Sequence, residues 1–227
     1  MARAHGPGRA EGVGNPRPLD DGMSRLLPVN IATKAIALVL AALPLLAPDR
    51  PGYRRKAMRA RAVVYPLVPM AIPVTWRRRG RPAPYPHAID IALALPLILD
   101  AGANASDLYG RIRNLDLVVH LVNTGLVVAA VGAGLSPLMP NRWSAAVLAT
   151  SLGISGEALW EIAEYLAQRS GATGMDLSYD NTTHDLISSS VGAAIGGLAT
   201  AGLLWPRRGE VGALFGWRLV QRPRPTA

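Results

Sequence analysis

Carboxylates and one histidine recur at helical spacing inside apolar stretches of this chain. Glu157, Glu161 and Glu164 are four and three residues apart, and Asp116 and His120 are four residues apart. Because an α-helix repeats every 3.6 residues, each set lies on one helical face. Ionisable groups in apolar surroundings can accept a proton, relay one or hold a cation. We therefore predict Glu157 and Glu161 as a general base or as relay residues.

A histidine beside carboxylates is also the donor set of a metal site. Helix bundles build such sites from side chains on facing helices, and hard or borderline divalent ions accept these ligands. A divalent metal is therefore a candidate cofactor, with these candidate ligands: Asp116, His120, Glu161, Glu164 and Asp185. The chain has no cysteine, which excludes thiolate ligands and thiol nucleophiles. It also has no HExxH or ExxH pair, so two alternatives stay open: a proton or cation relay, and a histidine that only hydrogen-bonds Asp116.

The same residues also have a structural interpretation. Asp116 and Asp185 stand at the starts of apolar segments, where a carboxylate can cap free backbone N–H groups. Arg111, Arg113 and Arg169 could pair with the other carboxylates in a salt-bridge network. A scaffold role therefore stands beside catalysis and transport.

The composition of the chain that carries these residues indicates a membrane protein. Half of the 227 residues are hydrophobic and 17% are charged, whereas a soluble domain carries about 25% charged residues. Spanning a bilayer takes about 20 apolar residues. Six apolar segments are present, at residues 29–47, 62–76, 89–105, 115–139, 144–166 and 186–205. We predict an all-α, polytopic integral membrane helix bundle with five or six transmembrane segments.

Three regions are expected along the chain. They are a disordered basic tail at 1–27, the transmembrane bundle at 28–206 and a basic cytoplasmic tail at 207–227. The segment at 62–76 is short and contains three prolines. It therefore either crosses the bilayer as a broken helix or turns back as a re-entrant or interfacial segment.

The net charge of +9 lies largely in basic clusters that flank the apolar segments. Such placement follows the positive-inside rule and does not favour nucleic-acid binding, so the expected partner is the lipid bilayer of the plasma membrane. The run at 77–81 and the C-terminal tail can share the cytoplasmic side. The ionisable groups named above then lie near the non-cytoplasmic surface. The basic run at 54–61 breaks the rule if the segment at 62–76 crosses fully.

Ser188, Gly192 and Gly196 form a stripe of small residues, each four residues from the next. Small residues at this spacing let helices approach closely in lipid. The stripe is expected to pack helices together, either within the bundle or between two copies in a homo-oligomer.

Three blocks of the sequence resemble the YjdF-like predicted inner-membrane proteins and, more distantly, the VanZ-like proteins. They are LILDAGANASDLYGRIRNLDLVVHLVN at 97–123, GEALWEIAEY at 156–165 and YDNTTHDL at 179–186, and they occur in the family's order. The resemblance covers about residues 90–205. By this resemblance, the family pattern is matched at Asp100, Asn104, Tyr109, Asp116, His120, Glu157, Glu161, Glu164, Tyr179, Thr182 and Asp185.

The chain departs from the family pattern at three positions. Leu117 and Asn181 stand where the family has aspartates, which weakens the metal interpretation, and His184 stands where the family has a small residue. We expect these polar residues to support the site: Asp100, Asn104, Asn123, Tyr179, Asn181 and Thr182.

The resemblance implies a polytopic membrane protein, and its VanZ-like part implies a cell-envelope context. The leading hypothesis is a multi-pass membrane protein with an intramembrane carboxylate and histidine cluster that serves a metal ion or a proton. One alternative is a membrane enzyme acting on a lipid or a cell-envelope precursor, with Glu157 or Glu161 as general base and His120 as metal ligand or acid. The other alternative is a structural scaffold.

Overall fold

The computed structural model describes residues 18–54, 56–81, 85–172, 174 and 177–215, and no strand occurs in that part of the chain. The α-helices are α1 (Pro18–Leu46), α2 (Met58–Val64), α3 (Leu67–Arg78), α4 (His87–Ala105), α5 (Leu115–Leu135), α6 (Arg142–Arg169), α7 (Tyr179–Ala199) and α8 (Arg208–Phe215). Short 3-10 turns lie at Pro51–Tyr53, Ser136–Leu138 and Trp205–Arg207, and Thr200–Leu204 is π-helical. The predicted all-α class is confirmed.

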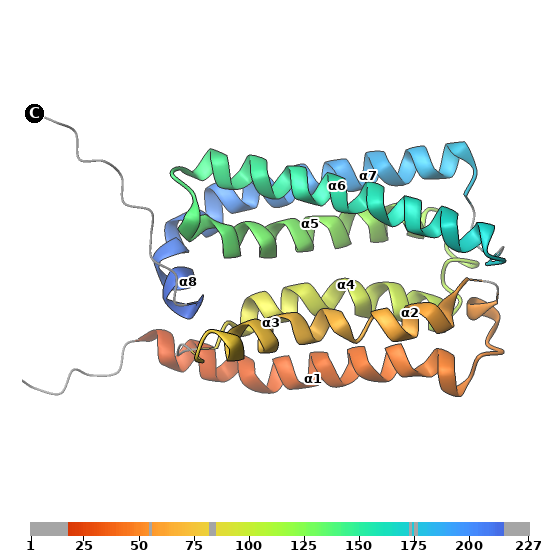
Figure 1. The fold of residues 1–227 in the computed structure, drawn as a ribbon, viewed down its shortest axis with the longest axis horizontal. Coiled ribbons are helices and arrows are strands. Elements are labelled where there is room, and N and C mark those ends of the chain that lie inside the picture. Colours follow the sequence, from red (N-terminus) through yellow and green to blue (C-terminus); the bar gives the residue numbers. More distant parts are fainter. Residues whose placement is uncertain (1–17, 55, 82–84, 173, 175–176, 216–227) are drawn as a thin grey trace, which may run out of the picture.

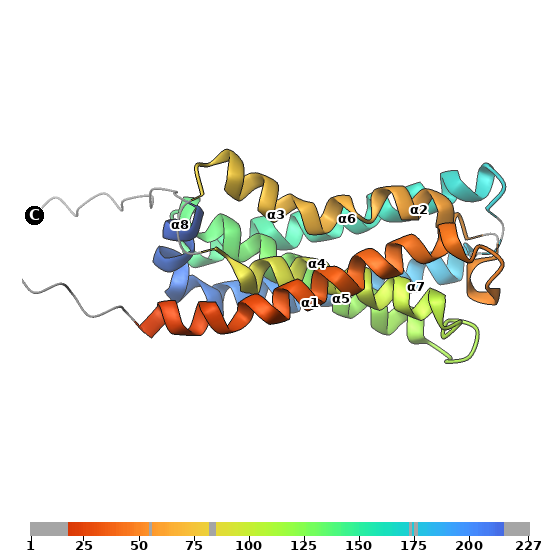
Figure 2. The same cartoon turned by 90° about the horizontal axis from the view of Figure 1, so that it is seen from below.

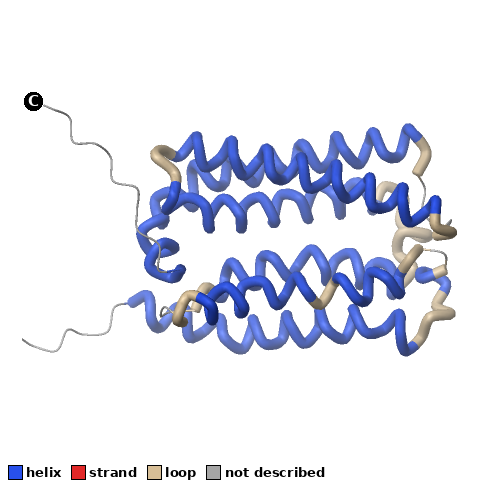
Figure 3. The backbone as a smooth tube through the Cα atoms, viewed as in Figure 1, coloured by secondary structure: helices blue, strands red, loops and turns tan. Residues whose placement is uncertain are grey.

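The long helices run side by side in two layers (Figures 1 and 3). α1 to α4 form one layer, and α5 to α7 form the other. α2 and α3 follow one another along the bundle (Figure 2), so the loops before α2 and after α3 lie at opposite ends. The start of α1 and the short α8 share one end of the bundle. The passages from α4 to α5 and from α6 to α7 share the other end.

Within the part of the chain that the structure describes, four stretches of helix are long and apolar enough to cross a membrane: Arg25–Leu46, His87–Ala105, Leu115–Leu138 and Tyr179–Arg207. The chain is therefore a polytopic membrane helix bundle with about four spans by this measure, fewer than the five or six expected. The 28-residue α6 is long enough but less apolar. The segment predicted at 62–76 is divided at Tyr65 and Pro66, because a proline inside a helix lacks the N–H that would continue the hydrogen-bond ladder.

Several helix starts differ from the expected ones. α7 begins at Tyr179, where the side chain of Ser178 accepts a hydrogen bond from the backbone N–H of Asn181. Asp185 therefore lies beyond the first turn, and its interpretation as a helix cap is wrong. α1 begins at Pro18, inside the stretch predicted as a tail. The rest of that stretch, residues 1–17, lies outside the described residues, as does 216–227 of the predicted C-terminal tail.

Each layer has its own small core. Ala37, Leu97 and Ala101 are buried in the layer of α1 to α4. Val128, Ala149 and Ala193 are buried between α5, α6 and α7. These alanines allow the helices to approach closely, as is usual in lipid.

The small-residue stripe on α7 packs against α5. A Cβ atom at Gly192 would collide with the backbone of Leu121, and one at Gly196 would collide with the backbone of Gly125. These two glycines are buried inside the chain. This face therefore packs within the bundle, where α5 covers both glycines.

Candidate functional site

The polar residues gather where α4 passes to α5 and α6 passes to α7. α4 contributes Asp100 near its C-terminus, α5 contributes Asp116 and His120 in its first turns, and α6 and α7 contribute further carboxylates. Short connections hold the ends of these helices together. Four helices thus bring ionisable groups to one end of the bundle.

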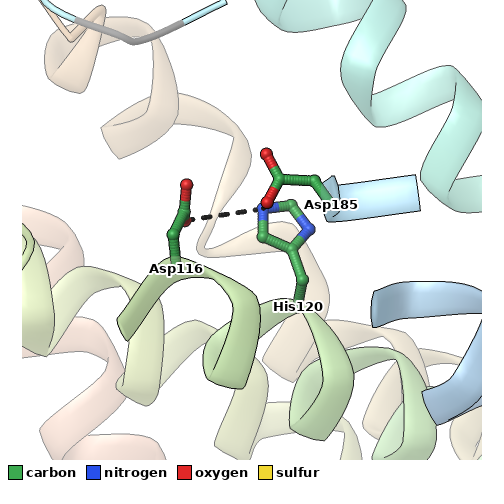
Figure 4. A group of neighbouring side chains, drawn as sticks. All are labelled: Asp116, His120 and Asp185. Carbon is green, nitrogen blue, oxygen red and sulfur yellow. Dashed lines mark ion pairs between the residues drawn. The ribbon is translucent and has the colours of Figure 1, made fainter. Parts of the chain in front are cut away.

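His120 lies at the centre of this group, and its side chain is 12% exposed. Its Nδ1 atom lies 2.5 Å from Oε1 of Glu157 and 3.5 Å from Oγ of Ser189. Its Nε2 atom lies 3.6 Å from Oδ1 of Asp116 and 4.0 Å from Oδ1 of Asp185. Figure 4 shows Asp116 from α5 and Asp185 from α7 approaching the same edge of the ring. Both ring nitrogens therefore face carboxylates.

The carboxylates around His120 could hold a metal ion. Asp116, His120 and Asp185 each offer a ligand atom, and so do His120, Glu157 and Glu161, with the atoms of each group within 4.8 Å of one another. One imidazole with several carboxylates suits zinc, manganese and similar divalent ions. The two groups share His120 but face different ring nitrogens, Nε2 in the first group and Nδ1 in the second, so they are two separate candidate sites on either side of the ring.

Three carboxylate oxygens of this site are buried without a hydrogen-bond partner among the described residues. They are both oxygens of Glu161 and Oδ1 of Asp185. The hydroxyl of Thr182 lies near Glu161 but makes no well-aligned hydrogen bond with it. A buried charged oxygen without a partner is costly. A bound cation or protons would remove that cost.

Arg61 of α2 forms a second network beside His120. Its Nη2 donates to Oε1 of Glu164 at 2.5 Å, and its Nη1 lies 3.4 Å from Oδ2 of Asp100. The guanidinium also stacks over Trp160, 4.9 Å from the ring centroid. Glu164, a predicted metal ligand, therefore pairs with Arg61 and is not in the group around His120. This ion pair joins the two layers of the bundle.

Asp100 accepts hydrogen bonds from several other side chains. The Tyr65 hydroxyl donates to its Oδ2, and the Tyr109 hydroxyl and the Asn104 amide donate to its Oδ1 at 3.0 and 3.1 Å. Burial and the nearby negative charge of Asp100 raise the pKa of Tyr109. Lys56 donates to Oδ1 of Asn104 at 3.3 Å, and burial lowers the pKa of Lys56. Asp100 and Asn104 therefore belong to the Arg61 network.

The remaining predicted residues have different surroundings. Asn181 donates to Oδ2 of Asp185 at 2.6 Å, so it positions a carboxylate of the site. Asn123 donates to the carbonyl of Pro96 at 3.4 Å. Tyr179 is 89% exposed. Arg111, expected to neutralise a carboxylate of the site, instead lies 3.9 Å from Asp107.

Sequence reasoning missed Arg61, Thr124 and Ser189. Thr124 donates to Oε2 of Glu157 at 3.4 Å, and Ser189 is fully buried beside the imidazole. Thr124 follows His120 by four residues and Ser189 follows Asp185 by four, so the same helical spacing could have identified both. Arg61 gave no such signal, because its partners are 39 and 103 residues away along the chain.

A cavity of about 470 Å³ lies between the two layers. Its polar lining includes Asp116, His120 and Glu157, and its apolar lining includes Leu93 and Val131. This volume falls within the range of small-molecule sites. The carboxylate and histidine site is therefore open to a cavity.

A different polar cluster lies at the opposite end, in the first half of α1 and the first turn of α4. Asp90 is 1% exposed, and its Oδ2 lies 2.6 Å from Nζ of Lys34. The Tyr85 hydroxyl and the Asn30 amide donate to the same oxygen at 2.5 and 2.9 Å. This cluster has one carboxylate and one ammonium group.

A family model described as "Predicted membrane protein (DUF2238)" matches residues 31–206 of the chain. The matched stretch contains every residue of the site around His120 and of the Arg61 network. No curated protein and no solved structure matches the chain.

Proposed function

This chain belongs to the DUF2238 family of predicted membrane proteins, and from that premise we propose that it binds a divalent metal ion inside its helix bundle. The ion would be held by Nδ1 of His120 and the carboxylates of Glu157 and Glu161, while Asp116 and Asp185 face the other ring nitrogen. The observation that carries this proposal is the set of three buried carboxylate oxygens without hydrogen-bond partners beside one imidazole.

The balance of charge also supports a bound cation. Six carboxylates gather at this end: Asp100, Asp116, Glu157, Glu161, Glu164 and Asp185. Among the described residues, only Arg61 and His120 form ion pairs with them. Lys56 also interacts electrostatically with Asp100 and Asp116, so at most three of these six negative charges are balanced by the described residues named here. A divalent ion would neutralise two more, and buried charges within a bilayer are normally paired with an ion or with one another.

Metal content is the test of this proposal. The protein is purified without chelator, dialysed against Zn²⁺ or Mn²⁺, washed and analysed by elemental mass spectrometry. We expect one equivalent in the wild type and loss of that equivalent in His120→Ala and Glu161→Ala. Asp180→Asn is the matched control, because Asp180 is an exposed carboxylate on the same helix as Asp185. Wild-type protein without stoichiometric metal would contradict the proposal.

A proton relay is the second candidate function, and the contacts of both His120 nitrogens support it. An imidazole with a carboxylate at each nitrogen can take a proton on one side and release it on the other. A relay predicts pH-driven proton flux in proteoliposomes of metal-free protein, abolished in His120→Ala. Flux that is equal in wild type and variant would count against it.

A membrane enzyme is the third candidate, and the cavity that reaches Glu157 supports it. Glu157 or Glu161 would act as general base beside a metal held by His120. The resemblance to YjdF-like and VanZ-like proteins would place such an enzyme in the cell envelope. This role predicts turnover of a lipid or envelope precursor that Glu157→Gln abolishes while the metal is retained.

We further propose six passes through the plasma membrane, with the C-terminus in the cytoplasm. The path of α2 and α3 along the whole bundle supports a broken second pass over residues 62–76. Arg54 and Arg78 are exposed at the two ends of this path. In a chain without cysteine, Arg54→Cys and Arg78→Cys should react with an impermeant thiol reagent from opposite sides. Labelling of both from one side would support a re-entrant segment instead.

A further inference from the structure

The cavity between the layers changes character along its length. At the end near the α4–α5 connection its lining includes Asp116, His120 and Glu157, and toward the other end it includes Val127 and Val131. Leu93 and Leu97 of α4 and Leu152 of α6 extend the apolar lining. The cavity therefore suits a ligand with a polar head and an apolar body.

The cavity is also elongated. Along α5 its lining runs from Asp116 to Val131, which is roughly 22 Å at the rise of an α-helix. A compact metabolite would leave most of this length empty. A single extended alkyl chain would follow it.

The polar end of the cavity carries an excess of negative charge. Asp100, Asp116, Glu157 and Glu164 all line it. Arg61 pairs with two of them, Asp100 and Glu164. Among the described residues, the ion-pair partner of both Asp116 and Glu157 is His120, which also faces the carboxylate of Asp185. An anionic head group would be repelled here, and a cationic one attracted.

Aromatic rings lie at the same end. Tyr65, Tyr109 and Trp160 line the cavity beside the carboxylates. Ring faces attract ammonium groups, and sites for quaternary ammonium ions are built from such rings. Lys56 and Arg61 of the chain already lie over the rings of Tyr109 and Trp160, so the carboxylates of Asp116 and Glu157 are the groups that most favour a cationic head group here.

We propose that this cavity binds a lipophilic organic cation. The ammonium head lies among the carboxylates and rings of the polar end, and the alkyl chain lies along the apolar walls of α4, α5 and α6. This ligand class goes beyond the proposed metal site and does not require a metal. Because a metal ion and the ammonium head would compete for Glu157, binding of the organic cation is measured after the metal content of the sample has been recorded and the metal removed with a chelator.

Gly156 provides the variant that tests this proposal. It lines the cavity one residue before Glu157, and a Cβ atom there would meet nothing within 4 Å. Gly156→Leu therefore adds a side chain at an exposed edge of the cavity lining without colliding with neighbouring backbone. Gly134 of α5 has equally open surroundings but is not part of the lining. Gly134→Leu is the matched control.

The experiment measures binding of dodecyltrimethylammonium to protein in phosphatidylcholine nanodiscs by isothermal titration calorimetry. Empty nanodiscs serve as blank, and dodecyl sulfate supplies the same chain with an anionic head. We expect saturable binding of the cation and none of the sulfate. Gly156→Leu should weaken binding of the cation by about tenfold or more, because the added side chain overpacks the site, whereas Gly134→Leu should bind as the wild type does.

Glu157→Gln provides a second variant that keeps the size of the side chain and removes a charge, and it should also weaken binding. Saturable binding of both detergents, or unchanged binding in Gly156→Leu and Glu157→Gln, would overturn the proposal. Metal content is measured on the same samples. Loss of alkylammonium binding with retained metal in Gly156→Leu would show that the two ligands are separate, so that failure of one proposal is not mistaken for failure of the other.

Discussion

Two clusters of buried carboxylates lie at opposite ends of this bundle, and they differ in their balance of charge. At one end, Oδ2 of Asp90 receives the ammonium group of Lys34, the phenol of Tyr85 and the amide of Asn30. At the other end, Glu161 has no hydrogen-bond partner among the described residues. Oδ1 of Asp90 is also buried without a hydrogen-bond partner among the described residues. The two clusters therefore differ in charge: Asp90 is matched by Lys34, whereas the carboxylates around His120 outnumber the cationic groups that pair with them.

This difference separates structural from functional polar groups in a membrane interior. A buried ion pair with several donors can hold two helices together without any ligand. Carboxylates in excess need a partner from outside the chain, either a cation or protons. The comparison therefore supports a structural role for Lys34 and Asp90, and it supports the ligand-binding role that we propose for the cluster around His120.

The largest loss of stability is expected for Lys34→Met. Asp90 is 1% exposed, so the remaining charge has no access to water. Removing one partner of a buried pair costs roughly 3 to 5 kcal/mol of the free energy of unfolding, and we expect the upper part of that range. Thermal unfolding in detergent would measure the loss, with Lys34→Met in an Asp90→Asn background as control. If Lys34→Met were as stable as the wild type, a structural role for this cluster would be contradicted.

A smaller loss is expected for Arg61→Met, about 3 kcal/mol. The carboxylates of Asp100 and Glu164 lose their ion-pair partner, but they line the cavity and can take up protons there. Part of the loss should be recovered when Glu164→Gln is added, because the double variant leaves fewer unbalanced charges. Additive losses in the double-mutant cycle would show that the pair does not couple the two layers.

Tyr109→Phe should cost about 2 kcal/mol at neutral pH, because it removes a hydrogen bond to a carboxylate. The raised pKa of Tyr109 also predicts a dependence on pH. The folded chain holds the phenol proton more tightly than the unfolded chain, so this contribution is complete below about pH 10, the ordinary pKa of tyrosine. It is lost as pH rises further. The free energy of unfolding, measured from pH 8 to pH 11, should decline less steeply in Tyr109→Phe than in the wild type. Equal slopes in the two proteins would contradict the prediction.

The smallest change in stability is expected for Glu161→Gln. Removing a buried charge without a partner leaves the free energy of unfolding of the metal-free protein unchanged or raises it by about 1 kcal/mol. Glu161→Ala would add a cavity and is therefore less informative here. A scaffold role predicts the opposite, a clear loss of stability. Thermal unfolding of the wild type and of Glu161→Gln, both after removal of metal with a chelator, would distinguish a ligand-binding role from a scaffold role.

Sequence patterns predicted some elements of this fold closely. α4 and α5 were expected at 89–105 and 115–139, and they occur at His87–Ala105 and Leu115–Leu135. Their apolar runs are bounded by polar connections, so hydropathy alone locates their ends. The start of α7 was predicted too late because its first turns are polar. Only the capping serine at Ser178 indicates that the helix has begun.

Contacts between distant residues were the least predictable part. Helical spacing placed His120 and Glu157 on faces that could meet, but their pairing depends on how α5 packs against α6. The Arg61 network needed the path of the broken second segment, which the prolines obscured. The pairing of Lys34 with Asp90 is predictable from the sequence. Each residue is an isolated charge in an apolar segment, and such charges usually pair.

The most direct test of the account is thermal unfolding with and without added Mn²⁺. A ligand that binds only the folded chain stabilises it by about 2.7 kcal/mol at one hundred times its dissociation constant. We expect Mn²⁺ to raise the unfolding temperature of the wild type and of Asp90→Asn, but not of His120→Ala. An equal shift in all three proteins, or no shift in any, would contradict a cation site at His120.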